Sequence, residues 1–179
     1  MLEQIICSGF GGQGVMLMGK LIALAALREN KQVLYLPSYG AEVRGGTAHC
    51  MIKISDKEIA SPYITHPDTC FAMNQLALNK FGSRIKNNGL LIINSSLAKV
   101  NTKGKKAKIL SLPLTKIAFS LGNVKVANTV ALGAYIAKKK IIKPESMVYA
   151  MRALAGKTKK HLLKINEQAL KKGMRHGKG

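Results

Sequence analysis

The residues best placed for chemistry are the glycines near the N-terminus. Gly9, Gly11 and Gly14 match the pattern GxGxxG between a strand-like segment, residues 4–8, and a helical pattern over 15–29. Glycines permit a tight turn, and backbone N–H groups at a helix N-terminus can approach an anion closely. The turn, with Gly12 included, therefore predicts a site for a negatively charged group, to which the Gln13 amide could add a donor.

The sequence around the turn limits what it binds. A dinucleotide site of the nicotinamide type also needs an acidic residue about 20 positions further on, at the end of the second strand. That strand, residues 32–36, runs into Pro37 and Ser38, and the next acid, Glu42, lies beyond it. Lys20 lies too far into the helix for a triphosphate-binding loop. A phosphate-bearing ligand, or a tight turn that packs on a neighbour, both remain open.

A second loop, residues 38–46, places Tyr39, Glu42 and Arg44 between glycines and ends with Gly45 and Gly46. Loops at the carboxyl edge of an open α/β sheet expose side chains to ligands or partners. The concentration of aromatic and charged groups favours a contact surface here. The alternative is a structural turn closed by a contact between Glu42 and Arg44.

Metal chemistry is not expected. Cys7, Cys50 and Cys70 are widely spaced among apolar neighbours, no CxxC occurs, and the four histidines show no ligand-like spacing. A structural zinc or an iron–sulfur cluster usually needs about four ligands with close pairs among them. We therefore interpret the three cysteines as buried, reduced thiols.

The elements that hold these residues begin as strand, glycine turn, helix and strand, a βαβ unit whose crossover predicts a parallel sheet. The fold class is thus α/β, a Rossmann-like, mostly parallel sheet flanked by helices, with a helical C-terminal third. Further strands are predicted at 48–54, 69–73, 90–94 and 108–112, and helices at 74–81, 114–121, 127–138, 145–154 and 159–171. We expect one domain over 1–179, with 172–179 a frayed tail.

The charge is large and uneven. The net charge is +21; residues 1–95 carry 9 Lys/Arg and 6 Asp/Glu, whereas residues 96–179 carry 20 and 2, and 18 of those 20 are Lys. Nucleic-acid recognition favours Arg and stacking aromatics, so an acidic partner and a solvated lysine surface are the two interpretations. No apolar run reaches the roughly 20 residues of a membrane span, and the N-terminus shows no signal peptide, so a cytoplasmic protein is expected.

Several strings together resemble one family, the gamma subunits of 2-oxoacid:ferredoxin oxidoreductases. The strings are Gly9-Phe10-Gly11-Gly12-Gln13-Gly14-Val15, Ser38-Tyr39-Gly40-Ala41-Glu42-Val43-Arg44-Gly45-Gly46, Ser61-Pro62, Gly122-Asn123 and Ala127-Asn128-Thr129-Val130-Ala131-Leu132-Gly133-Ala134. Their order and spacing match from residue 3 to about 137. Within the family, residues 37–42, 72–75 and 94–96 look most like the 2-oxoglutarate branch.

The resemblance implies a subunit without its own redox centre. Companion subunits would bind thiamine diphosphate, magnesium and, on a ferredoxin-like chain, iron–sulfur clusters. The assembly would decarboxylate a 2-oxoacid, form an acyl-CoA and pass two electrons to ferredoxin.

In that assembly, the glycine turn would hold coenzyme A phosphates or a partner chain. Tyr39, Glu42 and Arg44 would dock on the thiamine-binding subunit, with Arg44 as a fork for carboxylate or phosphate. Asn128, at the start of a helix, would cap it and face the same region, or only cap it.

Two other classes of protein remain as alternatives. A stand-alone nucleotide-binding or regulatory protein would use the glycine turn without companions and bind a free dinucleotide. A nucleic-acid binder rests on charge alone and should show a steep salt dependence.

Overall fold

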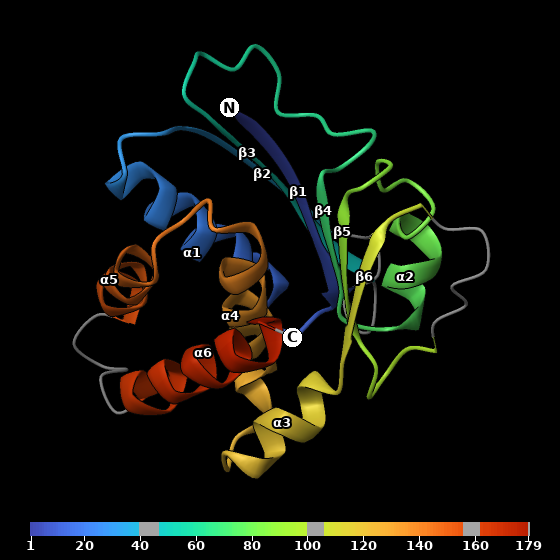
Figure 1. Ribbon diagram of the computed structural model, residues 1–179, viewed down its shortest axis with the longest axis vertical. Coiled ribbons are helices and arrows are strands. Elements are labelled where there is room, and N and C mark those ends of the chain that lie inside the picture. The colour runs from blue at the N-terminus through green and yellow to red at the C-terminus, as the bar shows by residue number, and fades with distance from the viewer. Residues whose placement is uncertain (40–46, 100–105, 156–161, 179) are drawn as a thin grey trace.

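The computed structural model describes residues 1–39, 47–99, 106–155 and 162–178. In these residues six strands form one sheet in the order β2-β3-β1-β4-β5-β6, with helices on both faces (Figure 1). The strands are β1 (Leu2–Phe10), β2 (Gln32–Tyr39), β3 (Thr47–Ser55), β4 (Thr69–Ala72), β5 (Leu90–Asn94) and β6 (Lys108–Leu112). The helices are α1 (Val15–Arg28), α2 (Gln75–Phe81), α3 (Leu114–Ser120), the short 3-10 turn η1 (Val124–Val126), α4 (Ala127–Lys139), α5 (Pro144–Ala155) and α6 (Leu163–Lys178).

The predicted α/β class and mostly parallel sheet are confirmed, with one difference in the order of strands. β1, β4, β5 and β6 pair in parallel, but β3 lies between β1 and β2 and is antiparallel to both. β1 and β2 therefore run in the same direction without being neighbours. Since β3 follows β2 after only residues 40–46, it can return beside β2 as an antiparallel strand, which needs no long crossover.

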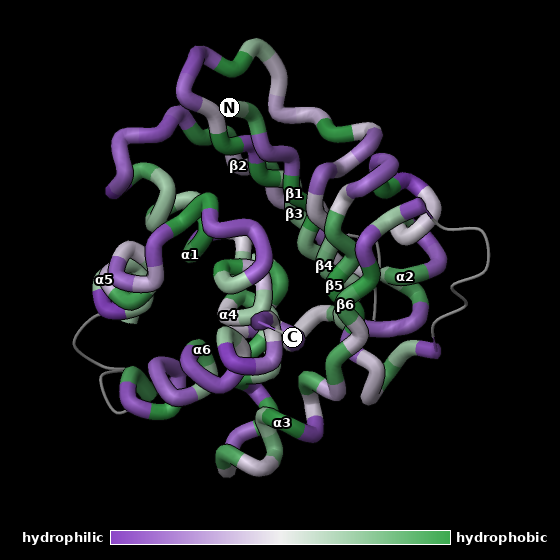
Figure 2. The backbone as a smooth tube through the Cα atoms, viewed as in Figure 1, coloured by the Kyte–Doolittle hydropathy of each residue, from purple (hydrophilic) through white to green (hydrophobic). Residues whose placement is uncertain are grey.

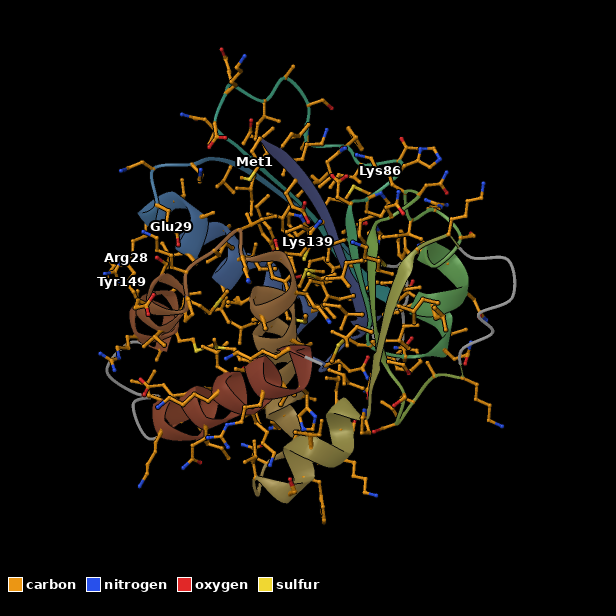
Figure 3. The ribbon with its side chains drawn as sticks, viewed as in Figure 1. Met1, Arg28, Glu29, Lys86, Lys139 and Tyr149 are labelled. Carbon is orange, nitrogen blue, oxygen red and sulfur yellow. The ribbon has the colours of Figure 1, made fainter. Side chains whose placement is uncertain are left out.

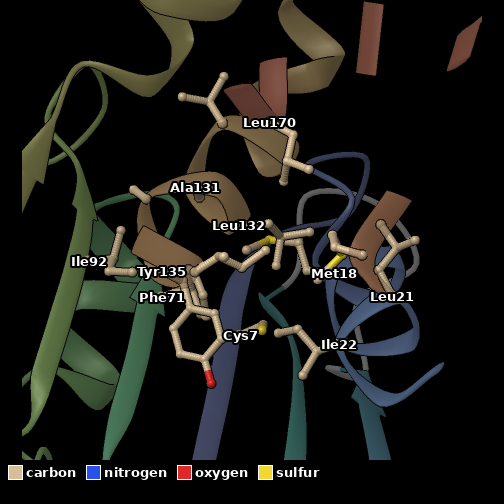
Figure 4. Packing of buried hydrophobic residues seen from close by; sticks show 14 of the residues in the cluster. Cys7, Met18, Leu21, Ile22, Phe71, Ile92, Ala131, Leu132, Tyr135 and Leu170 are labelled. Atoms are coloured by element: carbon tan, nitrogen blue, oxygen red, sulfur yellow. The ribbon is translucent and has the colours of Figure 1, made fainter. Parts of the chain in front are cut away.

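The two faces of the sheet bury different side chains. Ile5 and Cys7 of β1 face α1 and α4, whereas Ile6 faces α2. Figure 2 shows the hydrophobic residues concentrated along the central strands and the helix faces that cover them. In the larger core, the ring of Tyr135 packs 5.6 Å from that of Phe71, among otherwise aliphatic side chains (Figure 4). Helices cover both faces because successive side chains along a strand point to opposite faces of the sheet.

Helices α4 and α6 pack so closely that only glycine fits between them. A Cβ on Gly133 would lie 2.2 Å from the carbonyl oxygen of Leu170, and one on Gly173 would lie 2.0 Å from that of Val130. Gly177 meets Ala134 in the same way. The predicted frayed tail is therefore wrong over residues 172–178, because tertiary contact with α4 extends α6 to Lys178.

Polar contacts fasten the edges of the helical layer to the sheet. The ammonium of Lys139 lies 3.0 Å from a Glu3 carboxylate oxygen, and the hydroxyl of Thr69 donates to the other at 2.6 Å. Burial raises the pKa of Glu3 in spite of both contacts. On the far side, Arg28 stacks on Tyr149 at 4.2 Å, and Glu29 accepts the backbone N–H of Lys143 (Figure 3). The end of α4 is thus held to the sheet, and α5 with the segment before it is held to the end of α1.

The glycine contact predicts a large effect of one methyl group. Gly173→Ala should lower the free energy of unfolding by about 1–3 kcal/mol, because the added Cβ meets backbone that cannot turn aside. In an exposed helix the same change would stabilise the protein by up to about 1 kcal/mol. The sign of the change in the free energy of unfolding therefore tests the packing. Urea unfolding followed by circular dichroism measures it, with Lys172→Ala on the exposed side as control. An unchanged or raised midpoint for Gly173→Ala would contradict the packing.

Candidate ligand and partner site at the glycine turn

The glycine turn follows β1 and opens α1, as the sequence predicts. Gly12 and Gly14 have φ angles of 93° and 73°, the left-handed region that favours glycine. Gly14 is the N-cap of α1 and offers no side-chain oxygen to the helix. Within the described part of the chain, the N–H groups of Gly11, Gly12 and Gly14 donate to no acceptor. The turn therefore presents unused donors at the positive end of a helix.

The glycines of the turn differ in the reason why each position is glycine. A Cβ on Gly9 would lie 2.6 Å from Gln13 Oε1, and one on Gly14 would lie 2.4 Å from Asn128 Nδ2. Gly11, by contrast, has open space around it and no positive φ. Neither the packing nor the backbone conformation of this chain requires glycine there. The open space favours the close approach of something outside the chain.

The Gln13 amide has a structural role in addition to the predicted one. Its Oε1 accepts the backbone N–H of Phe10 at 2.8 Å and the side-chain amide of Asn74 at 2.9 Å, and its Nε2 donates to the Met73 carbonyl at 3.2 Å. Gln13 therefore ties the turn to the end of β4, and this network uses one of the two Nε2 hydrogens. Asn74 in turn caps α2 by accepting the N–H of Ala77.

A second buried amide extends this network to the next strand. Asn94, 1% exposed at the end of β5, donates to the Met73 carbonyl at 3.3 Å and to the hydroxyl of Thr115 at 2.9 Å. Sequence reasoning did not assign Asn74, Asn94 or Thr115 to the site. The available signal was an amide at the end of an otherwise apolar strand, because a buried polar group requires partners.

Asn128 faces the glycine turn, as predicted, but it does not cap its helix. The N-cap of α4 is Val126, with no side-chain hydrogen bond. The 3-10 turn η1 has taken the preceding residues, so Asn128 lies inside the first turn of α4. Its Nδ2 donates to the Gly14 carbonyl at 3.4 Å, and its Oδ1 accepts the N–H of Thr129 at 2.8 Å. Asn128 therefore joins α4 to the glycine turn.

Beside this network lies a pocket of about 190 Å³ at the carboxyl ends of β1, β4 and β5. Its lining residues are Gly12, Gln13, Met73, Asn94, Leu97, Thr115, Val124, Lys125 and Ala127. Lys125 is exposed and supplies a positive charge where the Gly12 N–H is unused. The carboxyl edge of an open α/β sheet is where such folds bind ligands. This pocket can hold a small anionic group.

The surface around the pocket is apolar. Leu97 and Val124, which line it, are 47% and 49% exposed. Large exposed apolar side chains near one another indicate a surface that packs against another protein. The pocket thus combines unused backbone donors with exposed apolar side chains at its rim.

The second predicted loop is placed only at its start. Tyr39, 73% exposed, ends β2 and pairs with Ala48, which pairs on its other side with Gly9. Tyr39 thus lies at the same edge as the glycine turn, two strands or roughly 10 Å away. Glu42, Arg44, Gly45 and Gly46 lie outside the described residues.

Two further sequence predictions concern metals and membranes. The three cysteines are buried and form no disulfide, and burial raises the pKa of the Cys7 thiol well above its usual value. No cluster of three or more metal-ligating side chains occurs among the residues that the structure describes. In the same residues, no helix has both the length and the apolar character needed to cross a membrane.

The fold and the site are those of a known family. The chain belongs to the pyruvate ferredoxin/flavodoxin oxidoreductase family, whose model matches residues 4–176. It is similar over 98% of its length, and 98% of the other chain, to the gamma subunit of a keto/oxoacid ferredoxin oxidoreductase from Geobacter sulfurreducens PCA, with a TM-score of 0.83 and 29% identity. The resemblance noted in the sequence is confirmed.

Named relatives act on different substrates. Ketoisovalerate oxidoreductase subunit VorA of Methanothermobacter thermautotrophicus is 37% identical over 130 residues, which is 73% of this chain and 27% of VorA. The chain thus spans about a quarter of that relative. The 2-oxoglutarate synthase subunit KorC of Methanocaldococcus jannaschii is 34% identical over 154 residues, 84% of this chain and 82% of KorC.

The Gln13 network predicts that its amide is structural. Gln13→Ala should lower the free energy of unfolding by about 1–3 kcal/mol, because it leaves the part-buried donors of Phe10 and Asn74 without their acceptor. Gln13→Glu keeps the acceptor for both donors but replaces the donor to Met73 with a carboxylate oxygen that the Met73 carbonyl repels, so it should also lower the free energy of unfolding. Urea unfolding measures both, with the exposed Gln168→Ala as control. Equal midpoints for wild type and Gln13→Ala would show that the amide does not hold the turn.

Proposed function

We propose that this chain is the gamma-type subunit of a cytoplasmic, multi-subunit 2-oxoacid:ferredoxin oxidoreductase, which oxidatively decarboxylates a 2-oxoacid to an acyl-CoA and passes electrons to ferredoxin. The observation that carries the proposal is the family match over residues 4–176, together with the near-complete overlap with a gamma subunit. The free donors of the glycine turn and the apolar rim around them support a chain that works within an assembly.

The redox groups belong, in this proposal, to companion chains. Cys7 of β1 and Cys50 of β3 lie opposite each other in the core on one face of the sheet. Cys70 lies in the core on the other face. This donor set does not fit an iron–sulfur cluster, which needs about four thiolates around one point. Thiamine diphosphate, magnesium and the clusters are therefore expected on companion subunits.

The role of this chain is to close one side of the active-site region and hold the phosphates of coenzyme A. The N–H groups of Gly11, Gly12 and Gly14 and the ammonium of Lys125 supply the donors. At about 190 Å³, the pocket suits a phosphate group of the coenzyme rather than the whole molecule. Tyr39 and the loop after it, including Glu42 and Arg44, would dock on the thiamine-binding subunit.

The preferred substrate is proposed to be 2-oxoglutarate. The strings that favour this branch contain Asn74, which donates to Gln13 of the glycine turn, and Asn94, which donates to the Met73 carbonyl that Gln13 also binds. KorC, a 2-oxoglutarate synthase subunit, overlaps more than four fifths of this chain. Ketoisovalerate remains the alternative substrate, since VorA is of similar identity.

Co-purification tests the subunit role. The chain, drawn from native extract under anaerobic conditions, should bring companions that reduce a low-potential dye when coenzyme A and a 2-oxoacid are both present. The rate should be highest with 2-oxoglutarate, compared with pyruvate and ketoisovalerate. A chain that comes down alone, inert and able to bind a free dinucleotide would replace this proposal with the stand-alone nucleotide-binding protein.

A substitution at Gly11 tests whether coenzyme A or a partner chain binds the glycine turn. Gly11→Val should leave the urea midpoint of the chain almost unchanged, because a Cβ meets open space there. In the assembled complex it should raise the KM for coenzyme A by roughly tenfold, the worth of about 1.4 kcal/mol of lost contact. Lys125→Ala should shift the same KM.

Each other outcome of the Gly11 test has a definite meaning. Loss of companions with the chain still folded would assign the turn to a partner chain. An intact complex with an unchanged KM for coenzyme A would refute the role of the turn in holding the coenzyme.

A further inference from the structure

The solvent-facing side of α6 carries a row of positive charge. Spacings of three and four residues put its exposed side chains on one side of the helix, opposite the glycines that meet α4. These basic residues are Lys164, Lys171, Lys172, Arg175 and Lys178. They extend over about 21 Å at 1.5 Å per residue. We call these five residues the α6 basic face; Figure 2 shows hydrophilic residues along this helix.

Nothing within α6 neutralises this row. The helix is described over its whole length and contains a single acidic residue, Glu167, which is bound to Arg152 of α5 at 2.8 Å. The neighbouring end of α4 adds the exposed Lys138 and Lys140. The α6 basic face therefore meets solvent as a field of one sign.

The stability of the helix explains only part of this charge. Arg175 and Lys178 lie in the last turn, where cations interact favourably with the helix dipole. Lys171 and Lys172 lie before that turn, and Lys164 lies in the first turn, where a positive charge is unfavourable. At least three lysines are thus present without a structural reason inside the chain.

The scaffold holds these charges in fixed relative positions. Gly173 and Gly177 bring the backbone of α6 against α4, and the hydroxyl of Thr129 donates to the side chain of Asn166 at 2.8 Å. A row of charge on a rigid helix can attract an oppositely charged surface in one orientation and raise its association rate.

The chemistry of the face indicates a transient protein partner. Permanent interfaces have apolar centres and few lysines, whereas electron-transfer encounters are small and electrostatic. None of the large apolar side chains along α6 is strongly exposed, whereas Leu97 and Val124, which line the glycine-turn pocket, are 47% and 49% exposed. Companion subunits suit the apolar rim, and a soluble acidic protein suits the α6 basic face.

We propose that the α6 basic face is a docking surface for a small acidic electron-carrier protein that takes electrons from the assembled complex. The family description includes ferredoxin and flavodoxin as acceptors. The identity of this partner as the acceptor rests on the proposed function, whereas the docking of an acidic protein rests on the charge and geometry of α6. Nucleic acid fits less well, because four of the five residues are Lys and the face has no aromatic side chain on which bases could stack.

The test compares two triple charge reversals in the purified complex. The first changes Lys164, Lys171 and Lys172 to Glu; the second changes the exposed Lys57, Lys80 and Lys99, which lie on α2 and in loops away from α6, to Glu. Rates are measured with purified acidic ferredoxin and with an uncharged low-potential dye over a range of salt. The first variant should lower kcat/KM for ferredoxin by roughly tenfold or more at low salt and flatten its salt dependence, with the dye rate unchanged.

A direct binding measurement keeps the two proposals separable. The chain alone, wild type and both variants, is titrated with the same ferredoxin and with duplex DNA. Ferredoxin binding that only the α6 reversal weakens supports docking, even if the complex shows no 2-oxoacid activity and the proposed function fails. Docking is overturned if both reversals act equally on ferredoxin, if neither acts, or if the α6 reversal weakens only DNA binding.

Discussion

The burial of α4 on every side is the constraint on which the rest of the structure depends. All residues from 127 to 136 are buried, so this helix has no solvent face over its first ten residues. A helix surrounded in this way must be apolar all round and small wherever a neighbour approaches. Ala131, Gly133 and Ala134 meet that requirement, and they allow α6 to lie against its backbone. The sheet, α1 and α6 are all arranged around this helix.

The two ends of α4 then determine where the functional surfaces lie. At its start, Asn128 reaches the glycine turn through the Gly14 carbonyl, and Ala127 and Val124 border the anion pocket. At its end, Lys139 pairs with Glu3 at the opposite edge of the sheet. Burial of the Glu3 carboxylate opposes its charge. The ion pair therefore does more to fix the position of α4 against β1 than to stabilise the fold. A shift of α4 along its axis would move the glycine turn and the basic helix together.

Local pattern was sufficient to predict the glycine turn and α1, and insufficient to predict the end of α6. The turn and α1 follow from Gly12 and Gly14 and from the helical spacing after them, signals that depend on a few neighbouring residues. The end of α6 does not, because Gly173 and Gly177 read locally as helix breakers and are explained only by backbone 40 residues earlier. The insertion of β3 and the role of Gln13 are of the same kind. Each depends on a partner distant in sequence, as Gln13 does on Met73 and Asn74.

The division of the surface follows from what each side must do. The carboxyl edge combines unused N–H donors with apolar side chains, which gain most when a neighbour excludes water from them permanently. The α6 basic face has charge without apolar area, so binding there gains little from water exclusion and stays reversible and dependent on salt. In the proposed assembly, a subunit that stays bound to its companions while a carrier arrives and leaves would need both kinds of surface, held apart on one rigid body. The glycine contacts between α4 and α6 provide that rigidity, because they leave neither helix room to shift against the other.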